Sequence, residues 1–425
     1  MRNQGGRIMV LLLLAGMLLT ACTSSKEQPK DLPAEHDSQE KGQTLTVIEP
    51  NRTEPETTKR TESPEKKYQI QTRLSDFHLL SDTTGIAWGS TRGELRLYRT
   101  EDNGTTWTNI SPAGTVQFPG IVRYGKELFF ADSMNGWIVR NGGGTSETIV
   151  LYTTDGGVNW KVSSLPKSVQ VSDISFVSKQ QGWLMTTQNS TPGNQEKLLY
   201  RTLDGGKTWK TVMHSQTDNS STTPLPEFGY ISDMEFGNSM YGYVVQQELD
   251  RPKLYITTDG GYHWRTSNSN FEKKDMGKCD QYTSRSISFL NAQHTSAWVP
   301  VGCSRGQESK YNGYFTADRG ATWSFAAFPL EWQSGPNRYI PPTFINGREG
   351  WSLSGVNLLH TMDQGKTWAK LPVSDKLEKM MTDYPEVAKL EFVSSSVGWI
   401  LIQNYDERKS LLLQTKDGGM NWRVL

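Results

Sequence analysis

The sequence predicts an all-β protein, a seven-bladed β-propeller built from four-stranded antiparallel blades. A four-point pattern, Thr-x-Asp-x-Gly-x-x-Trp, recurs seven times without substitution, and its successive aspartates lie 53, 49, 55, 59, 45 and 54 residues apart. That period is typical of a propeller blade. A second marker lies upstream of these copies, an apolar residue followed by Gly and a large apolar residue. Helical periodicity is not evident over any long stretch, which favours strands throughout.

The chain begins with a predicted targeting segment. Arg2 and Arg7 precede an apolar run from Ile8 to Leu19, which is too short to span a bilayer and has the length of a signal-peptide core. The run leads into Thr20, Ala21 and Cys22, an arrangement that resembles the bacterial lipobox. We expect residues 1–21 to be a lipoprotein signal peptide and Cys22 to be lipidated, which anchors the protein at the extracytoplasmic face of the bacterial cell membrane. The alternative is an ordinary signal peptide with an incidental cysteine.

Residues 22–67 are predicted to form a disordered tether. No Phe, Trp or Tyr occurs between Thr23 and Lys67, where charged residues are mixed with Pro, Ser, Thr and Gln. Such a segment cannot bury enough apolar area to offset its ordering entropy. The propeller is expected to occupy residues 68–425. The whole chain has 45 basic and 45 acidic residues, so no nucleic-acid partner is expected.

Each copy of the four-point pattern predicts a tight turn between the third and fourth strands of a blade, strands C and D. The Asp side chain is expected to accept hydrogen bonds from backbone N–H groups about two residues on. Gly supplies a positive φ, and Trp fills the start of strand D. We therefore expect a structural and not a catalytic role for the seven aspartates, which are Asp102, Asp155, Asp204, Asp259, Asp318, Asp363 and Asp417.

The second marker separates strands A and B of each repeat. In the third repeat, for example, the four strands are expected at 171–176, 183–187, 198–202 and 209–213. The last strand D ends at Leu425, so the ring must close without a covalent link, with residues 68–72 as the candidate neighbour of that strand.

The seven copies resemble the Asp-box (BNR) repeat of sialidase-like, sortilin-type and photosystem II assembly-factor propellers. The resemblance extends from Leu74 to Leu425. The Phe…Gly-Trp and Asp-Gly-Gly signatures are most similar to those of the photosystem II assembly/stability factor family and its non-photosynthetic bacterial lipoprotein relatives. The resemblance implies a non-enzymatic propeller that binds a protein partner at the membrane or cell envelope.

The connections between strands divide into two kinds. The A–B and C–D turns are nearly fixed in length, whereas 16 to 27 residues separate each Asp-box Trp from the next strand-A marker. Variable loops on a rigid scaffold commonly carry binding sites, so the face with the D–A and B–C connections is the expected binding face. The candidate contact residues on it are Arg123, Tyr124, Arg251, Arg285, Arg305, Trp332, Arg338 and Tyr339, with Phe271, Tyr311 and Tyr384 as further candidates.

Trp332 is unusual among the tryptophans. Thirteen of the 14 belong to one of the two repeat markers, and Trp332 belongs to neither. Its neighbours Arg338 and Tyr339 give this segment the composition of a contact hot spot for protein or sugar. The alternative is that Trp332 folds back and covers the rim of the ring.

Two further cysteines occur in the fifth repeat. Cys279 lies just before strand A and Cys303 just after strand B. Strands A and B are antiparallel, so these two ends should lie close together, and we expect a disulfide in an oxidising compartment.

No catalytic or metal-binding pattern is found. The six His residues lack zinc-ligand spacing and there is no Gly-x-Ser-x-Gly elbow, so neither a cofactor nor a metal is predicted. The leading hypothesis is the lipid-anchored, protein-binding propeller. The alternative is a glycan-binding or glycosidase (sialidase-like) propeller that uses Trp332 with Glu227, Asp250 or Glu331. A third hypothesis is a cell-envelope scaffold without a single ligand.

Overall fold

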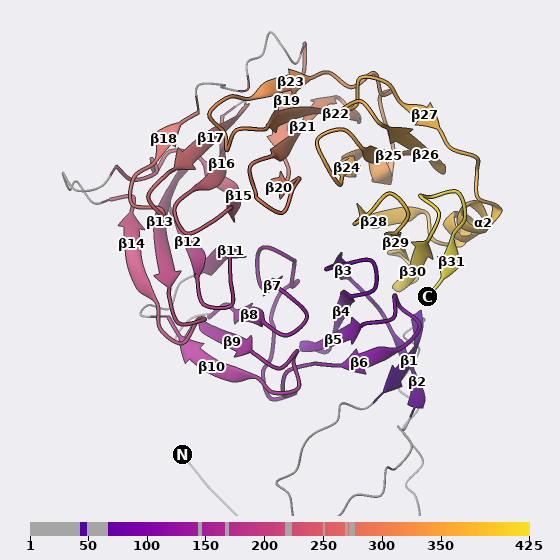
Figure 1. Cartoon of the computed structure of the whole chain (residues 1–425), viewed down its shortest axis with the longest axis horizontal. Helices are drawn as coiled ribbons and strands as arrows, with labels where there is room; N and C mark the ends of the chain where they lie inside the picture. The colour runs from indigo at the N-terminus through magenta and orange to yellow at the C-terminus, as the bar shows by residue number, and fades with distance from the viewer. Residues whose placement is uncertain are drawn as a thin grey trace, which may run out of the picture. The chain divides into compact units, whose positions relative to one another are not determined.

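The computed structural model describes residues 43–48 and 67–425, except 143–146, 166–169, 217–222, 250, 268–270 and 272–276. The described residues belong to the second of two units of the chain, residues 40–425, and the predicted signal peptide and Cys22 lie outside them. Figure 1 shows the strands of this unit as seven separate sheets around a central axis, with β3, β7, β11, β15, β20, β24 and β28 innermost. The predicted seven-bladed propeller of four-stranded antiparallel blades is confirmed.

Each blade is formed by consecutive strands in the order A, B, C, D. Blade 1 has β3 (Asp76–Leu79), β4 (Gly85–Thr91), β5 (Glu94–Thr100) and β6 (Trp107–Asn109). Blade 2 has β7 (Leu128–Phe130), β8 (Gly136–Arg140), β9 (Ile149–Thr153) and β10 (Lys161–Ser164). Blade 3 has β11 (Gln170–Phe176), β12 (Gly182–Thr191), β13 (Asn194–Thr202) and β14 (Lys210–His214). Blade 4 has β15 (Tyr230–Phe236), β16 (Gly242–Glu248), β17 (Arg251–Thr257) and β18 (Arg265–Thr266).

The last three blades follow the same order. Strand A of blade 5 is split into β19 (Gln281–Ser284) and β20 (Ser288–Phe289), followed by β21 (Ala297–Arg305), β22 (Glu308–Thr316) and β23 (Ser324–Ala326). Blade 6 has β24 (Thr343–Phe344), β25 (Gly350–Ser354), β26 (Asn357–Thr361) and β27 (Ala369–Lys370). Blade 7 has β28 (Glu386–Phe392), β29 (Gly398–Asn404), β30 (Lys409–Thr415) and β31 (Arg423–Val424). The connections carry the 3-10 helix η1 (Pro336–Tyr339) and the helix α2 (Asp375–Asp383). Neither of these has the length that a helix needs to cross a bilayer, and none of the described residues forms a helix that does.

Two strands, β1 (Gln43–Ile48) and β2 (Lys67–Thr72), extend the outer edge of blade 1 (Figure 1). β1 pairs parallel with β6 and antiparallel with β2, and its Leu45 and Val47 are buried. The prediction of a structureless tether from residue 22 to 67 is therefore wrong at residues 43–48 and 67. Apolar residues alternate with threonines there, the pattern of a half-buried strand, and the lack of aromatic residues concealed it.

The Asp-box turns share one hydrogen-bond pattern. In blade 3, Asp204 Oδ1 accepts from the Thr202 hydroxyl at 2.8 Å and from the Thr208 N–H at 2.9 Å, and Oδ2 accepts from the Thr208 hydroxyl at 2.6 Å. In all seven boxes the N–H donor to the carboxylate lies four residues on, at 2.8 to 3.0 Å. The prediction of an N–H donor about two residues on is therefore wrong. The positive φ of Gly205 and Gly206 turns the chain further before it meets the carboxylate.

Both kinds of short turn lie on one face. In every blade, an Asp-box N–H donates to a carbonyl of the A–B turn, for example Gly156 to Met134 at 2.8 Å and Gly260 to Met240 at 2.6 Å. We call this side, formed by the A–B and C–D turns, the Asp-box face, and the side formed by the D–A and B–C connections the loop face.

The Phe…Gly-Trp marker joins neighbouring blades. Trp137 of blade 2 stacks on Phe176 of blade 3 with ring centroids 3.5 Å apart, and its indole N–H donates to the carbonyl of Gly205, in the Asp box of blade 3, at 2.9 Å. Trp183 and Trp351 repeat both contacts with the blades that follow them. The Gly of the marker is required because a Cβ at Gly182 would lie 2.4 Å from the Phe176 ring. The marker residues thus form an interlock between blades.

Blades 7 and 1 close the ring without sharing a sheet. The Trp399 indole N–H donates to Asn103 Oδ1 at 3.0 Å, which continues the interlock across the seam. Gln43 of β1 joins blade 1 to blade 7, because its side chain donates to the Leu425 carbonyl and accepts from the Leu412 N–H at 2.6 Å. Closure is non-covalent, as expected. The prediction that residues 68–72 lie beside the last strand is wrong, because they pair with β1.

Deleting residues 421–425 should destabilise the whole propeller. Trp422 is buried in the core of blade 7, and Leu425 provides the acceptor for Gln43 at the seam. Loss of a buried Trp alone costs about 3–5 kcal/mol. Thermal unfolding followed by circular dichroism measures the effect, with the exposed Met420→Ser as control. A truncated chain that melts at the wild-type temperature would contradict the closure described here.

The Asp boxes predict acid sensitivity. Hydrogen bonds from Thr367 lower the pKa of Asp363 to about 2. For the other six aspartates, partial burial raises the pKa, but the equivalent hydrogen bonds lower it by more, so that each pKa lies below the ordinary value of 3.8. Because the folded-state pKa is the lower one, their stabilisation is complete above the unfolded-state pKa and is lost as the pH falls through the folded-state pKa.

We therefore expect the free energy of unfolding to fall between about pH 4 and pH 2, measured by urea titration at several pH values. Asp204→Asn should lower stability at pH 7 by about 1–3 kcal/mol and make the pH dependence shallower. An unchanged pH profile in that variant would argue against the assignment.

Candidate functional site: an arginine-rimmed cavity on the loop face

A cavity of about 770 Å³ opens on the loop face near the axis. Its walls come from the first residues of strands A, such as Asp76 of β3, and from the last residues of strands B, such as Ser90 of β4 and Gln403 of β29. Strands A begin and strands B end at the loop face, so the cavity lies on the face that the sequence predicts for binding.

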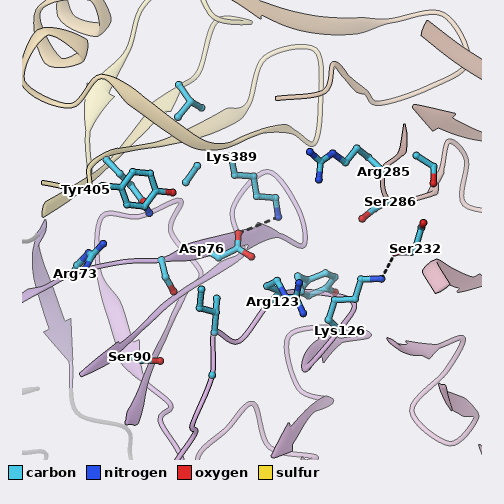
Figure 2. A pocket seen from close by; sticks show the side chains of 18 residues that line it. Arg73, Asp76, Ser90, Arg123, Lys126, Ser232, Arg285, Ser286, Lys389 and Tyr405 are labelled. Atoms are coloured by element: carbon cyan, nitrogen blue, oxygen red, sulfur yellow. Dashed lines mark hydrogen bonds and ion pairs between the residues drawn. The ribbon is translucent and has the colours of Figure 1, made fainter. Parts of the chain in front are cut away.

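Three arginines surround its mouth. Figure 2 shows Arg73, Arg123 and Arg285 reaching the cavity from different sides. Arg123 is exposed and lies 3.3 Å from Glu127, and the exposed Arg285 donates to the Tyr311 hydroxyl at 3.2 Å. The exposed guanidinium groups of these two residues keep donors available to a ligand, and a guanidinium matches a carboxylate with two parallel hydrogen bonds.

One side of the cavity floor is fixed by Lys126. Its ammonium group donates to Asp173 of blade 3 and, at 2.9 Å, to Asp233 of blade 4. Burial lowers the pKa of Lys126, but the two carboxylates outweigh burial and the pKa is raised, so Lys126 stays charged. This cation therefore ties blades 2, 3 and 4 together at the axis.

Glu235 lies next to this cluster and accepts a hydrogen bond from Ser175 at 3.0 Å. Burial, and then the charge of Asp233, raise the pKa of Glu235 well above its ordinary value. This shift favours the neutral form of Glu235 and so limits the negative charge around Lys126.

The other side of the floor is built around Lys389. Its ammonium group lies 2.8 Å from Glu391 and 3.7 Å from Asp76, and Glu391 also lies 2.9 Å from His78. Burial raises the pKa of Glu391, but His78 and Lys389 lower it to about 2. The His78 ring stacks on Tyr124 with centroids 3.6 Å apart, so this network spans blades 7, 1 and 2. Both lysines of the floor are thus paired with carboxylates, and the arginines at the mouth are the groups that a ligand meets.

Two smaller cavities continue the first one across the loop face. A cavity of about 510 Å³ shares Ser232, Ser284 and Arg285 with it and reaches Tyr339. A cavity of about 490 Å³ shares Gly120, Ile121 and Arg123. Ile121 and Tyr405 are 73% and 58% exposed at the rim. We call the three joined cavities the loop-face groove; it combines arginines with exposed apolar side chains.

The structure brings together four of the eight principal candidate residues. Arg123, Tyr124 and Arg285 line the large cavity, and Tyr339 lines the second one with Arg285. The others lie outside all three cavities; they are Arg251, Arg305, Trp332 and Arg338.

Trp332 covers the side of blade 5. Its half-buried ring packs against the core cluster of that blade, with the Arg305 guanidinium 4.4 Å and the Lys310 ammonium 5.7 Å from the ring centroid. These contacts favour the covering role over ligand contact. The further candidates Phe271 and Tyr311 are buried, and Tyr384 ends α2 beside Lys409.

Sequence reasoning missed Arg73, Lys126, Lys389 and Tyr405. Lys389 and Glu391 alternate on β28, the innermost strand of blade 7, and two charged residues within a strand A are a signal that could have found Lys389. For Lys126 no local signal exists, because its partners Asp173 and Asp233 lie 47 and 107 residues away in the chain.

Cys279 and Cys303 form a disulfide with Cα atoms 5.4 Å apart, close to Asp280 and Ser304 of the second cavity. Among the described residues, no group of three or more His, Cys, Asp or Glu side chains could hold a metal ion. Of the carboxylates considered for glycoside hydrolysis, Glu227 and Glu331 line none of the three cavities, and Asp250 lies outside the described residues.

Seven Asp-box blades around this axial cavity define the class of the protein, an Asp-box β-propeller. The family model of sortilin, neurotensin receptor 3, matches residues 95–224. The chain is 23% identical over 292 residues to the photosystem II stability/assembly factor HCF136 of Arabidopsis thaliana, a match that covers 66% of this chain and 62% of that protein. The chain therefore spans less than two thirds of the length of that relative.

A second relative is the photosystem II assembly protein Ycf48 of a Synechococcus strain, 24% identical over 317 residues, which cover 63% of this chain and 79% of that protein. Among solved structures, YCF48 bound to D1 peptide is similar with a TM-score of 0.47 and 21% identity, covering 81% of this chain and 93% of that one. The resemblance to photosystem II assembly factors that the repeat markers indicate is confirmed.

Replacing Lys126 should destabilise the propeller at its axis. Lys126→Met leaves Asp173 and Asp233 buried without their cation, which costs about 3–5 kcal/mol. Urea unfolding measures the change, with Lys126→Arg as the charge-conserving variant. The triple variant K126M/D173N/D233N should recover part of the loss, because it removes the unpaired charges. If K126M is as stable as wild type, the axial ion pairs do not hold the blades.

Proposed function

We propose that this protein is an extracytoplasmic lipoprotein, anchored to the membrane through Cys22, whose propeller binds a protein partner through the loop face. On this proposal it acts as a non-enzymatic assembly or stability factor. The observation that carries the proposal is the arginine-rimmed cavity at the axis of the loop face. The names of its sequence relatives, which describe assembly factors, support the same class of function.

The groove suits an extended protein segment that carries carboxylates and apolar side chains. Arg123 and Arg285 can each bind a carboxylate by donating two hydrogen bonds, and Arg residues commonly contribute much of the binding energy of interfaces. The exposed Ile121 and Tyr405 provide apolar contact beside them. Asp76, the acidic residue that lines the large cavity, lies 3.7 Å from Lys389. The nearby carboxylates of Asp173, Asp233 and Glu391 also pair with lysines, which favours binding over hydrolysis.

Charge reversal at the mouth tests the proposal. Arg123→Glu with Arg285→Glu should reduce capture of the partner at least tenfold in a crosslinking pulldown from intact cells, because both donors are replaced by repelling carboxylates. The matched control is Lys376→Glu with Lys379→Glu on the exposed surface of α2, outside the groove. Trp332→Ala should leave capture unchanged. Equal capture by the arginine variant with unchanged melting would overturn the proposed site, and turnover of glycosides by the purified protein would overturn the non-enzymatic assignment.

A further inference from the structure

The loop-face groove has two unlike ends. The cavity of about 490 Å³, here the blade 2 cavity, forms one end, and the cavity of about 510 Å³, here the blade 5 cavity, forms the other. Among the described residues, each end shares lining residues with the large cavity and none with the opposite end. Blades 2 and 5 lie on opposite sides of the axis (Figure 1), so the groove crosses the axis from one blade to the other.

The blade 2 cavity offers an apolar surface. Its walls come mainly from the connection between blades 1 and 2 and from β8; the apolar lining residues are Phe118, Pro119, Gly120, Ile121, Val122 and Val139. The Ile121 side chain is exposed at the rim, whereas Phe118 and Val139 are buried beneath it. Covering this surface with an apolar group of a ligand removes both from water, which is favourable.

The polar groups of the blade 2 cavity are used within the protein. Glu127 accepts a hydrogen bond from the Arg123 N–H at 3.0 Å and pairs with the Arg123 guanidinium at 3.3 Å. Asn141 accepts from the Val171 N–H at 2.7 Å and donates to the Val171 carbonyl at 3.4 Å. The remaining polar side chain of the lining is the exposed Gln170. A ligand side chain that reaches past Arg123 therefore meets mainly apolar groups, and an apolar side chain fits there better than a charged one.

The blade 5 cavity has the opposite character. Eight of its ten lining residues carry a hydroxyl, amide or carboxyl group, and the other two are Arg285 and Gly306. Asp280 accepts from the Gly306 N–H at 2.8 Å, and its carboxylate favours a hydrogen-bond donor over an acidic group. The buried Ser284 hydroxyl makes no hydrogen bond within the described part of the chain. Because buried hydroxyl groups usually have a partner, this end suits a polar side chain of a ligand.

The junctions between the cavities carry the arginines. Arg123 lines both the large cavity and the blade 2 cavity, and Arg285 lines both the large cavity and the blade 5 cavity. Between these junctions the large cavity adds Arg73 and the exposed Tyr405 (Figure 2). A segment that lies along the groove therefore passes Arg123 and Arg285 between an apolar end and a polar end, and each guanidinium can donate two hydrogen bonds to a carboxylate.

We propose that the groove selects its protein ligand by the order of side-chain classes along the segment. The proposal rests on the protein-binding function proposed above. The ligand has a large apolar side chain in the blade 2 cavity, carboxylates at Arg123 and Arg285, and hydroxyl or amide side chains in the blade 5 cavity. The exchanged order is penalised, because an apolar side chain would then cover hydrogen-bonding groups and polar side chains would lie on an apolar wall. Selectivity arises from this penalty as well as from the favourable contacts.

Selection from a random peptide library displayed on phage tests this inference. The target is the immobilised mature chain with Cys22→Ser, and the probe is the library itself. We expect Asp and Glu to be enriched about threefold or more over the unselected library, because they pair with the arginines. Leu, Ile, Met or Phe should be enriched on one side of the acidic residues, and Ser, Thr, Asn or Gln on the other side.

A charged residue at the apolar end should change the selected peptides. Ile121→Lys should lower the enrichment of apolar residues about threefold or more and select a further acidic residue in their place, because an ammonium group replaces the apolar contact. The matched control is Leu249→Lys, which is exposed and lines none of the three cavities, and it should select the same peptides as the parent chain. Equal melting temperatures establish that both variants are folded.

The outcomes separate this inference from the proposed function. Acidic enrichment without apolar and polar residues on opposite sides, or peptides that Ile121→Lys leaves unchanged, would overturn the order along the groove and leave the protein-binding site standing. Acidic enrichment that persists in the variant with Arg123→Glu and Arg285→Glu would overturn the site itself. A parent chain that enriches no acidic peptide would overturn both.

Discussion

The indole contact between neighbouring blades is the interaction on which the propeller depends. One four-stranded sheet exposes two faces, and only a neighbour can cover them. The strand-B tryptophan provides this cover and also fixes the rotation between blades, because its ring must lie flat on Phe176 while its N–H meets the Gly205 carbonyl. The Asp box holds that carbonyl in place, so the two sequence markers are two halves of one joint. Trp183 and Trp351 repeat this joint, whereas at the seam the Trp399 ring is tilted against Phe77 and its N–H donates to the Asn103 side chain.

This dependence explains what could be read from the sequence. The residues of the joint follow fixed spacing and rare types, so blade number, strand order and the identity of the two faces were predictable. The sequence could not show whether Trp332 contacts a ligand or covers the rim, since only the packing of Arg305 on its ring decides between the two roles. The strand at residues 43–48 was not predicted, because its pattern is short and its partner, β6, lies 60 residues downstream.

The axial cavity could be predicted only in part. Its exposed arginines lie in variable loops, where residue type and face are enough to nominate them, as for Arg123 and Arg285. Its floor depends on charges from different blades that meet at the axis, and their pairing is a property of the closed ring. Lys126 illustrates this, since its carboxylate partners are meaningful only once blades 2, 3 and 4 stand side by side.

Every blade is made from one uninterrupted stretch of chain, and blade 7 meets blade 1 without a covalent link, through the Trp399–Asn103 and Gln43–Leu425 hydrogen bonds. A blade can therefore be gained or lost as a whole. An in-frame duplication or deletion of about fifty codons adds or removes one complete blade and leaves no sheet with a missing strand. A circularly permuted chain, with its ends joined across Gln43 and Leu425 and opened between any other two blades, should adopt the same ring.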